Sequence, residues 1–205
     1  MSEQTPHIEP TLTPSGSLAP AYFHSLYAKQ TDPWEFEKSP YEAAKYKATL
    51  AALPHARYDQ ALELGCSIGV LTCQLARRCD HLLAIDVSEA ALAQARTRCA
   101  DLFQVTFEQR DIAHDFPEGR SFDLLILSEV GYYFALPDLE VLRQRIKEAL
   151  KPGGQLLLVH FTDVTNYPLT ADTVHEYFLE WKESGWRLLH SAREKDYRLD
   201  LLEVS

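Results

Sequence analysis

The segment QALELGCSIGVLTCQLARRC, residues 60–79, contains the run GCSIG at residues 65–69. This run matches the G-x-S-x-G pattern in which a serine nucleophile, here Ser67, stands on a tight turn. The same residues could instead form a glycine turn whose backbone lies against a bound small molecule. Both interpretations predict a buried strand, the turn, and a helix from about Val70. Residues elsewhere in the chain must therefore distinguish them.

An acid after the next apolar run favours a ligand-binding turn. Asp86 ends the run at residues 81–86, where a carboxylate can accept hydrogen bonds from both hydroxyls of a ribose. A dinucleotide site would need a third glycine in the turn, but position 70 is Val70. The spacing therefore predicts a nucleoside site that holds no pyrophosphate.

The hydrolase alternative requires partners for Ser67. A serine on this kind of turn follows several strands and an oxyanion loop, whereas here only a tail and two helical patterns precede the first predicted strand. A triad could still be composed on paper from Ser67, Asp123 or Asp138, and His160 or His190.

From residue 58 onward, apolar runs that fit strands alternate with helical patterns. Strands are predicted at residues 61–64, 81–86, 104–109, 122–128 and 155–161. Helices are predicted between them at residues 70–78, 89–100 and 136–150. This order is typical of an α/β, doubly wound, mostly parallel sheet.

The two ends of the chain depart from this alternation. Two helical patterns, at residues 18–30 and 39–53, precede the first strand, and a helix over residues 171–184 is followed by an antiparallel hairpin. Residues 1–18 are rich in Pro, Ser and Thr without hydrophobic periodicity, which predicts a mobile tail. We expect one domain at 19–205, divided into a helical cap at 19–56 and a core at 57–205.

Composition limits the partners and the location. The formal charge of −10 argues against nucleic acid and anionic membranes as partners. The chain shows neither a signal peptide nor a membrane-spanning apolar run, so a cytoplasmic location is expected. The four cysteines form no C-x-x-C pair and are predicted to be reduced, and no metal site is expected. A monomer or a homodimer would fit.

From about Tyr22 to the C-terminal hairpin, the chain resembles the class I S-adenosylmethionine-dependent methyltransferases. The resemblance is carried by LELGCSIG at 62–69, LLAIDVS at 82–88, EQRDI at 108–112, FDLLILSEVGYYF at 122–134 and LKPGGQLLLV at 150–159. Ser67 departs from the glycine of many members, but a small residue still lets the backbone approach a ligand. The resemblance implies a Rossmann-like, seven-stranded sheet with an antiparallel C-terminal hairpin and an N-terminal helical lid.

Three further segments narrow the resemblance. DPWEFEKSPYEAAKY at 32–46, SEVGYY at 128–133 and TADTV at 170–174 are similar to the NodS-like nodulation N-methyltransferases. Members of that group methylate an amino group on a sugar or oligosaccharide.

The resemblance also implies which residues form the site. S-adenosylmethionine would be bound by the glycine turn, the strand ends and the N-terminal cap: Trp34, Lys45, Glu63, Gly65, Cys66, Ser67, Gly69, Asp86, Val87, Asp111, Ile112 and Ser128. Glu129, Tyr132 and His160 are the predicted catalytic residues. Glu129 and His160 could accept or position the proton of an amine, and Tyr132 belongs to an aromatic wall suited to a sulfonium.

The sequence therefore predicts an S-adenosylmethionine-dependent N-methyltransferase that acts on an amino sugar, an oligosaccharide amine or a similar small polar amine. The alternatives are methylation of an oxygen or carboxyl group on another small molecule, a non-catalytic module that binds S-adenosylmethionine, and the serine hydrolase.

Overall fold

The computed structural model describes residues 9–205, apart from the side chains of residues 183 and 184. A seven-stranded sheet in the order β3-β2-β1-β4-β5-β7-β6 forms its centre. The strands are β1 (Tyr58–Leu64), β2 (Cys79–Asp86), β3 (Val105–Gln109), β4 (Phe122–Ser128), β5 (Leu150–Phe161), β6 (Arg187–Arg193) and β7 (Tyr197–Glu203). The α-helices are α1 (Pro20–Lys29), α2 (Pro40–Ala52), α3 (Val70–Leu75), α4 (Glu89–Arg98), α5 (Leu136–Ala149) and α6 (Ala171–Leu179).

The five strands from β3 to β5 are parallel, and β7 pairs antiparallel with both β5 and β6. The predicted mostly parallel sheet with an antiparallel C-terminal hairpin is thus confirmed. The strand order reverses between β1 and β4, and a crevice opens beyond the carboxyl ends of the strands at such a point. The chain segments that follow β1, β2 and β4 therefore meet at one edge.

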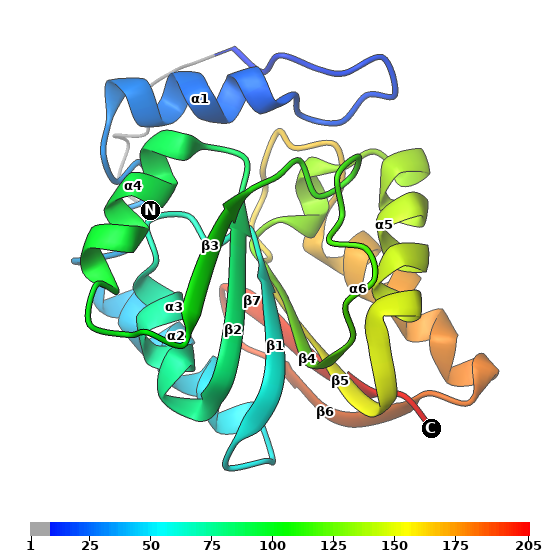
Figure 1. Cartoon of the computed structure of the whole chain (residues 1–205). Helices are drawn as coiled ribbons and strands as arrows, with labels where there is room; N and C mark the ends of the chain where they lie inside the picture. Colours follow the sequence, from blue (N-terminus) through cyan, green and yellow to red (C-terminus); the bar gives the residue numbers. More distant parts are fainter. Residues whose placement is uncertain (1–8) are drawn as a thin grey trace.

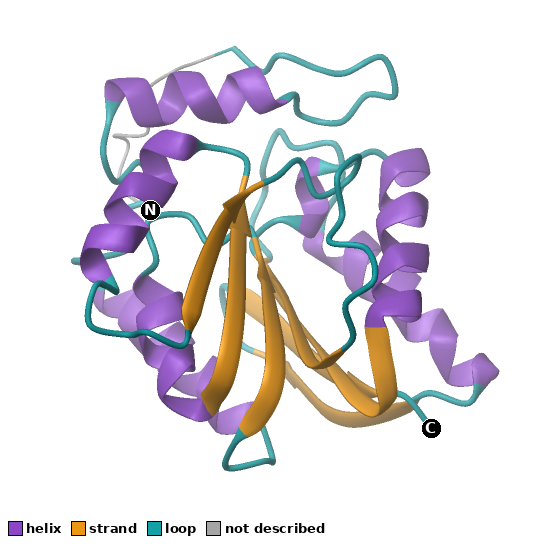
Figure 2. Ribbon diagram, in the orientation of Figure 1, coloured by secondary structure: helices purple, strands orange, loops and turns teal. Residues whose placement is uncertain are grey.

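Helices cover both faces of the sheet, with α2, α3 and α4 on one side and α5 and α6 on the other (Figures 1 and 2). Because both faces are covered, consecutive residues of the central strands are buried: Ala61 and Leu62 of β1 and Leu124 and Leu125 of β4 are at most 1% exposed. Helix α1 lies across the carboxyl edge of the sheet as a roof (Figure 1). This arrangement encloses the crevice.

The segment before α1 packs against the domain more closely than expected. Residues 1–8 of the predicted tail lie outside the described part of the chain. Leu12 and Leu18 form a β-bridge, and the buried Ser17 hydroxyl donates to Asp138 and accepts from the backbone N–H of Ala135. These contacts are polar and are made with residues distant in the sequence, so hydrophobic periodicity could not reveal them. Residues 9–18 of the segment predicted as a mobile tail therefore make contacts that composition did not indicate.

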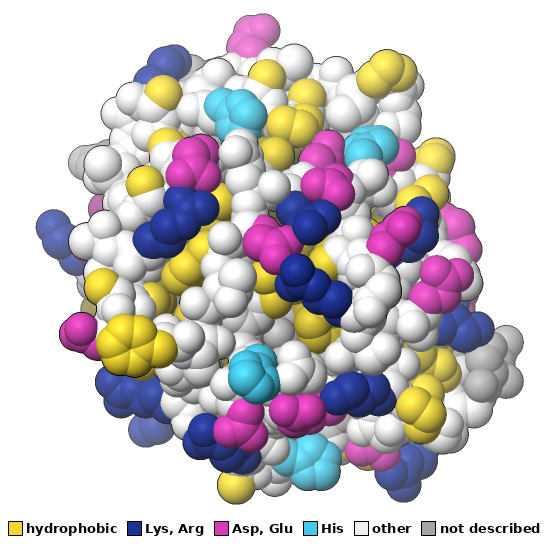
Figure 3. Space-filling model, viewed as in Figure 1, with side chains coloured by type: hydrophobic (Ala, Val, Ile, Leu, Met, Phe, Trp, Pro, Cys, Tyr) yellow, Lys and Arg dark blue, Asp and Glu magenta, His cyan; other side chains and the backbone are white. Residues whose placement is uncertain are grey.

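The surface mixes charges of both signs. On the face seen in Figure 3, Lys and Arg side chains lie beside Asp and Glu side chains. Arg110 forms ion pairs with Glu108 and Asp115, and Arg120 pairs with Glu108 as well. None of the helices in the described residues is long and apolar enough to cross a membrane.

Candidate functional site

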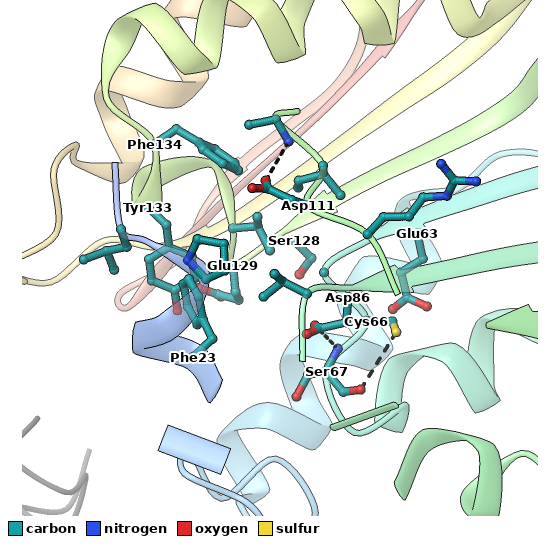
Figure 4. A pocket seen from close by; sticks show the side chains of 18 of the residues that line it. Phe23, Glu63, Cys66, Ser67, Asp86, Asp111, Ser128, Glu129, Tyr133 and Phe134 are labelled. Carbon is teal, nitrogen blue, oxygen red and sulfur yellow. Dashed lines mark hydrogen bonds between the residues drawn. The ribbon is translucent and has the colours of Figure 1, made fainter. Parts of the chain in front are cut away.

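The first cavity lies at the switch point, between the strand ends and the α1 roof. It contains about 1080 Å³ of empty space, part of it open to solvent. Its walls come from the glycine turn after β1, the ends of β2 and β4, and the loop after β3 (Figure 4). The N-terminal segment supplies the cover, including Phe23, Tyr27 and Trp34. Segments far apart in sequence therefore converge on one enclosed space.

The turn after β1 requires glycine at positions 65 and 69. Gly65 has φ +76°, and a Cβ built there would lie 2.3 Å from Val130 Cγ2. Gly69 has φ +79°, and its Cβ would lie 2.9 Å from Ala95 Cβ. Both positions favour glycine by conformation and also lack room for a side chain. The predicted role of these two glycines in shaping the turn thus has a steric basis.

Asp86 holds this turn in place. Its Oδ2 accepts a hydrogen bond from the backbone N–H of Ser67 at 2.9 Å (Figure 4). Its Oδ1 accepts from Ser88 N–H at 2.9 Å. Burial raises the pKa of Asp86, and these N–H donors act in the opposite direction. Each carboxylate oxygen can accept more than one hydrogen bond, so Asp86 keeps acceptor capacity toward the cavity. A ligand with neighbouring hydroxyls suits that position.

Glu63 is an ionisable residue of the first cavity that lacks a full set of hydrogen-bond partners. It is 3% exposed and lines the cavity, and its Oε2 has no hydrogen-bond partner among the described residues. Burial raises the pKa of Glu63 to about 8. A buried carboxyl group is costly to ionise unless a cation or donor compensates it. A ligand that carries an amino group would supply that compensation.

The loop after β3 and the end of β4 complete this wall. Asp111 lines the cavity, but its Oδ1 also accepts from Ala113 N–H at 3.3 Å and its Oδ2 pairs with His114 Nδ1 at 3.0 Å. Ile112, Val87, Cys66 and Ser128 line the same space. Asp111 therefore caps its own turn while it faces the cavity, so a local role and a ligand-binding role are compatible.

The Ser67 hydroxyl meets the lid instead of a catalytic base. It forms a hydrogen bond with the Tyr27 hydroxyl of α1. His160 accepts from a backbone N–H, and His190 is exposed on β6, which three strands separate from β1. Asp123 accepts from two backbone N–H groups of β1. The residues considered for a triad are thus committed to other contacts.

The second cavity adjoins the first and has a different lining. It contains about 1240 Å³ of empty space, part of it open to solvent. Its aromatic walls are Trp34, Phe36, Tyr41, Tyr132, Tyr133, Phe161 and Tyr167. Its charged groups are Glu35, Glu42, Glu129, Asp163, Asp196, Lys45 and Lys195. Acidic groups outnumber basic ones, which favours a cationic occupant.

Glu129 lies where the two cavities meet, because it lines both. Its Oε1 accepts from Lys45 Nζ at 2.6 Å, and its Oε2 accepts from Phe161 N–H at 3.1 Å and from the Tyr132 hydroxyl. Its backbone has φ 58°. The carboxylate is therefore held in one orientation by donors from three elements.

Backbone strain is concentrated at the two cavities. Within residues 9–205, the non-glycine residues with positive φ are Glu35 at 57°, Ser67 at 51° and Glu129 at 58°. Each lines at least one cavity. Such conformations persist where the surrounding structure enforces them, and they cluster at functional sites.

Lys45, which was predicted to bind the cofactor and to pair with a carboxylate, makes such a pair but lines the second cavity and not the first. It is 2% exposed and pairs with Glu42 at 2.9 Å as well as with Glu129. Burial works against the ammonium, but the two carboxylates outweigh it, so the pKa of Lys45 lies above its ordinary value. The reason for its position is that α2 directs this side chain toward the end of β4. Lys45 therefore acts on Glu129 and is separated from the cofactor wall.

His160 lies behind the site. It is fully buried and lines neither cavity, and its Nε2 accepts a hydrogen bond from Gly131 N–H at 3.0 Å. The predicted direct contact with an acceptor therefore does not match its place in the structure. The side chain of a strand-end residue points to one face or the other, and the apolar run of β5 gave no sign of which.

Sequence reasoning missed Tyr27, Glu42 and Tyr167. Tyr27 reaches Ser67, Glu42 pairs with Lys45, and Tyr167 stacks on Tyr132 with ring centroids 5.0 Å apart. Tyr27 belongs to a helical pattern and Tyr167 to a loop, so no motif distinguished them. Glu42 lies in the segment at 32–46, but that resemblance assigned it no role in the site. Trp34, which was predicted, lines both cavities.

Comparisons with known proteins agree with this arrangement. Residues 61–154 match the family model described as a methyltransferase domain. Nodulation protein S of Rhizobium tropici is 32% identical over 130 residues, which cover 62% of this chain and 53% of that protein. The chain therefore spans about half the length of this curated relative.

Two solved structures extend the comparison. The N-methyltransferase NodS from Bradyrhizobium japonicum, crystallised with S-adenosyl-l-homocysteine, superposes with a TM-score of 0.80 at 23% identity, over 90% of this chain and 98% of that one. A provisionally assigned methyltransferase from Pseudomonas syringae is 39% identical, with a TM-score of 0.70, over 80% of this chain and 98% of that one.

Proposed function

The chain belongs to the class I S-adenosylmethionine-dependent methyltransferases, and we propose that it transfers a methyl group to a small polar amine, such as the amino group of a sugar or oligosaccharide. The observation that carries this proposal is the junction at Glu129. There, the first cavity, with Asp86 and Asp111 in its wall, meets the acidic and aromatic second cavity.

The first cavity fits S-adenosylmethionine in its donor set. Asp86 would accept from the ribose hydroxyls, Asp111 and Ile112 would lie at the adenine, and the glycine turn would pass close to the ligand backbone. The buried and unpaired Glu63 oxygen suits the amino group of the methionine part. When bound, the cofactor supplies a methyl group on a sulfonium that is already activated for displacement.

The second cavity supplies the acceptor side. Its carboxylates attract an ammonium from solution, and aromatic faces such as Trp34 and Tyr41 stabilise a cation or stack on a sugar ring. An attacking amine must have lost its proton before it meets the methyl group. Asp163 and Asp196, two further carboxylates of the second cavity, favour capture of the amine but form no described contact with Glu129.

Glu129 would orient the amine at the junction. Lys45 and the N–H of Phe161 bind its two oxygens, so the carboxylate presents a fixed negative charge instead of a free base. Such a charge can accept a hydrogen bond from the attacking nitrogen and align its lone pair with the methyl group. Tyr132 fixes the same carboxylate from the other side. The chain's contribution is therefore orientation and the exclusion of water.

The lid performs the exclusion of water. Trp34 lines both cavities and stacks on Phe36 with centroids 5.6 Å apart, and Tyr27 ties α1 to the glycine turn. The displacement moves the positive charge from the sulfonium sulfur to the nitrogen of the methylated product. It is favoured when competing water is absent. We therefore propose that the N-terminal segment closes over both ligands.

The test uses matched acceptors. Labelled S-adenosylmethionine is supplied with a glucosamine oligosaccharide that carries one free amine, and with the same oligosaccharide fully N-acetylated. We expect transfer only to the free amine. Equal or faster transfer to the acetylated compound, or to a hydroxyl-only analogue, would replace the proposal with methylation of an oxygen.

A further inference from the structure

A row of buried polar groups leads away from Glu129 and is not used by the function proposed above. His160 on β5, His175 on α6 and Asp200 on β7 are each fully buried. They lie outside the lining of both cavities. Burying three adjacent titratable groups away from solvent costs free energy of folding, so we expect the row to have a physical role that explains them.

The hydrogen bonds of the row fix the position of every proton. Gly131 N–H donates to His160 Nε2 at 3.0 Å, and a backbone N–H can only donate. The proton of the neutral His160 ring is therefore on Nδ1, which lies 3.1 Å from His175 Nε2 and donates to it. His175 in turn carries its proton on Nδ1 and donates to Asp200 Oδ2 at 2.7 Å.

The row supports the loop that carries Glu129. Gly131 follows Glu129 by two residues and starts the 3₁₀ turn Gly131–Tyr133. A Cβ at Gly131 would lie 2.6 Å from Val174 Cγ1 and 2.9 Å from His160 Nε2, so the loop sits directly on the imidazole. Tyr132, which donates to Glu129, packs edge-on against the same ring with centroids 5.1 Å apart. A movement of His160 would therefore displace the Glu129 carboxylate.

Charged groups from several elements face the two rings. His175 and Lys45 both disfavour a charge on His160, and burial lowers its pKa well below the ordinary value. Burial also lowers the pKa of His175, against the opposing effect of Asp200, while Arg198 lowers it and Asp172 raises it. Both rings are therefore neutral at neutral pH.

Arg198 anchors the far end of the row. Its Nε donates to Asp200 Oδ2 at 2.9 Å, and its Nη1 contacts Asp172 and Glu176 at the surface. Burial raises the pKa of Asp200, but His175 and Arg198 outweigh burial and lower it below its ordinary value. Asp200 is therefore ionised. An ionised Asp200 fixes the tautomer of His175.

We propose that His160 and His175 are positioning residues that hold the Glu129 loop through Gly131 only while both rings are neutral, so that the row makes methyl transfer sensitive to acid. The proposal rests on the assignment of Glu129 to the transfer site. It adds two residues that touch neither cofactor nor acceptor.

The mechanism follows from the direction of the hydrogen bonds. A proton added to His160 must sit on Nε2, where it faces the N–H of Gly131, and two donors repel. A proton added to His175 sits on Nε2 and faces the Nδ1–H of His160, which forces the His160 proton onto Nε2. Either addition therefore breaks the same contact at Gly131.

Substitutions at His160 separate positioning from bulk. His160→Gln places an amide oxygen near the position of Nε2, where it can accept from Gly131 but cannot be protonated in this range. His160→Phe keeps a ring but leaves the Gly131 N–H without its acceptor. We expect kcat to fall ~10–100-fold in His160→Phe, because a small misplacement of a catalytic group has that effect. His160→Gln should recover much of this loss, and Kd for S-adenosylhomocysteine should stay within about threefold of wild type in both.

The pH profile distinguishes positioning from packing. The ratio of kcat for His160→Gln to kcat for wild type, measured with one acceptor, cancels the ionisation of that acceptor. Because burial lowers the pKa of both rings below the ordinary value of about 6.5, we expect this ratio to stay constant through pH 6.5 and to rise only at more acidic pH. A ratio independent of pH would overturn the proposal. His190→Gln, on the exposed strand β6, is the matched control and should follow wild type at every pH.

A measurement without turnover keeps the inference separate from the proposed function. Two-dimensional nitrogen NMR of the imidazoles reports which ring nitrogen carries the proton. We expect both His160 and His175 as the Nδ1–H tautomer at neutral pH. The Nε2–H tautomer at His160 would overturn the inference even if amine methylation is confirmed, whereas a wild type that methylates no amine would remove the proposed function and leave this result standing.

Discussion

The two cavities are built in different ways. The wall of the first that follows the strand ends is formed largely by the glycine turn, and its buried acid Asp86 is held by the N–H groups of neighbouring turns. The second is formed by long side chains from α2, β5 and the loops, and its central acid, Glu129, is held mainly by the side chains of Lys45 and Tyr132. The first cavity therefore depends on the path of the backbone, whereas the second depends on side-chain pairs that substitution can change.

This difference predicts different consequences of substitution. A side chain added at Gly65 or Gly69 in the first cavity must alter the path of the backbone, and it should therefore weaken cofactor binding. A change in the second leaves the backbone in place and should alter the rate or the choice of acceptor. If first-cavity variants lost rate and second-cavity variants lost cofactor affinity, this distinction between the two cavities would be wrong.

The largest effect is expected for Gly65→Ala. The new Cβ would lie 2.3 Å from Val130 Cγ2 in a conformation with φ +76°, so the turn must move. We expect the Kd for S-adenosylhomocysteine to rise at least about 100-fold, since a displaced turn loses contacts along the whole ligand. Calorimetry on the folded variant measures it.

Gly153→Ala is the matched control for this change. Gly153 has φ +75°, nearly the same as Gly65, but nothing lies within 4 Å of the added Cβ. The two variants share the conformational strain and differ in the collision. If both bind the cofactor equally well, the close fit of Gly65 against Val130 has no role in binding.

A smaller effect that depends on pH is expected at Glu63. Burial raises the pKa of Glu63 to about 8, so the free protein carries it protonated at neutral pH. A cationic amino group binds best to the ionised form, and binding must therefore release a proton below pH 8. Cofactor affinity should rise with pH, by at most about tenfold per unit, until the carboxyl group is ionised without ligand.

Glu63→Gln should flatten this dependence between about pH 6 and pH 7.5, while Glu118→Gln at the surface should retain it. Proton release can be followed by calorimetry in buffers of different ionisation enthalpy. A wild type whose affinity is independent of pH would show that Glu63 does not face the amino group.

The smallest effect is expected for Ser67→Ala. Alanine keeps the small volume of the turn and removes only the hydrogen bond to Tyr27. Turnover should stay within about fivefold of wild type, because a single neutral hydrogen bond contributes about 1 kcal/mol. Loss of all activity in a folded variant, or labelling of Ser67 by a fluorophosphonate, would restore the nucleophile interpretation.

The sequence could predict the first cavity because its determinants are local. The glycine turn and Asp86 follow consecutive strands, and parallel strands bring their carboxyl ends to one edge. Lys45 and His160 were placed in contact with ligands because a helix or strand position does not say which neighbour a long side chain reaches. Tyr27 and His175 could not be found at all, because their partners, Ser67 and Asp200, are 40 and 25 residues away in the sequence. Glu42 pairs with Lys45, only three residues away, but the sequence did not show that this pair reaches the site.

The most direct test of the account is the effect of Glu129→Gln on binding and turnover, measured together. Glutamine keeps the size of the side chain but removes the charge that faces the junction and its pairing with Lys45. Glu140→Gln on α5 is a matched control, because Glu140 also accepts from a tyrosine hydroxyl but lies at the surface. If Glu129 orients the amine, we expect kcat on a free-amine oligosaccharide to fall ~10–100-fold while the Kd for S-adenosylhomocysteine changes by less than about threefold. An equal loss of cofactor affinity and turnover would contradict it, since Glu129 would then belong to the first cavity alone.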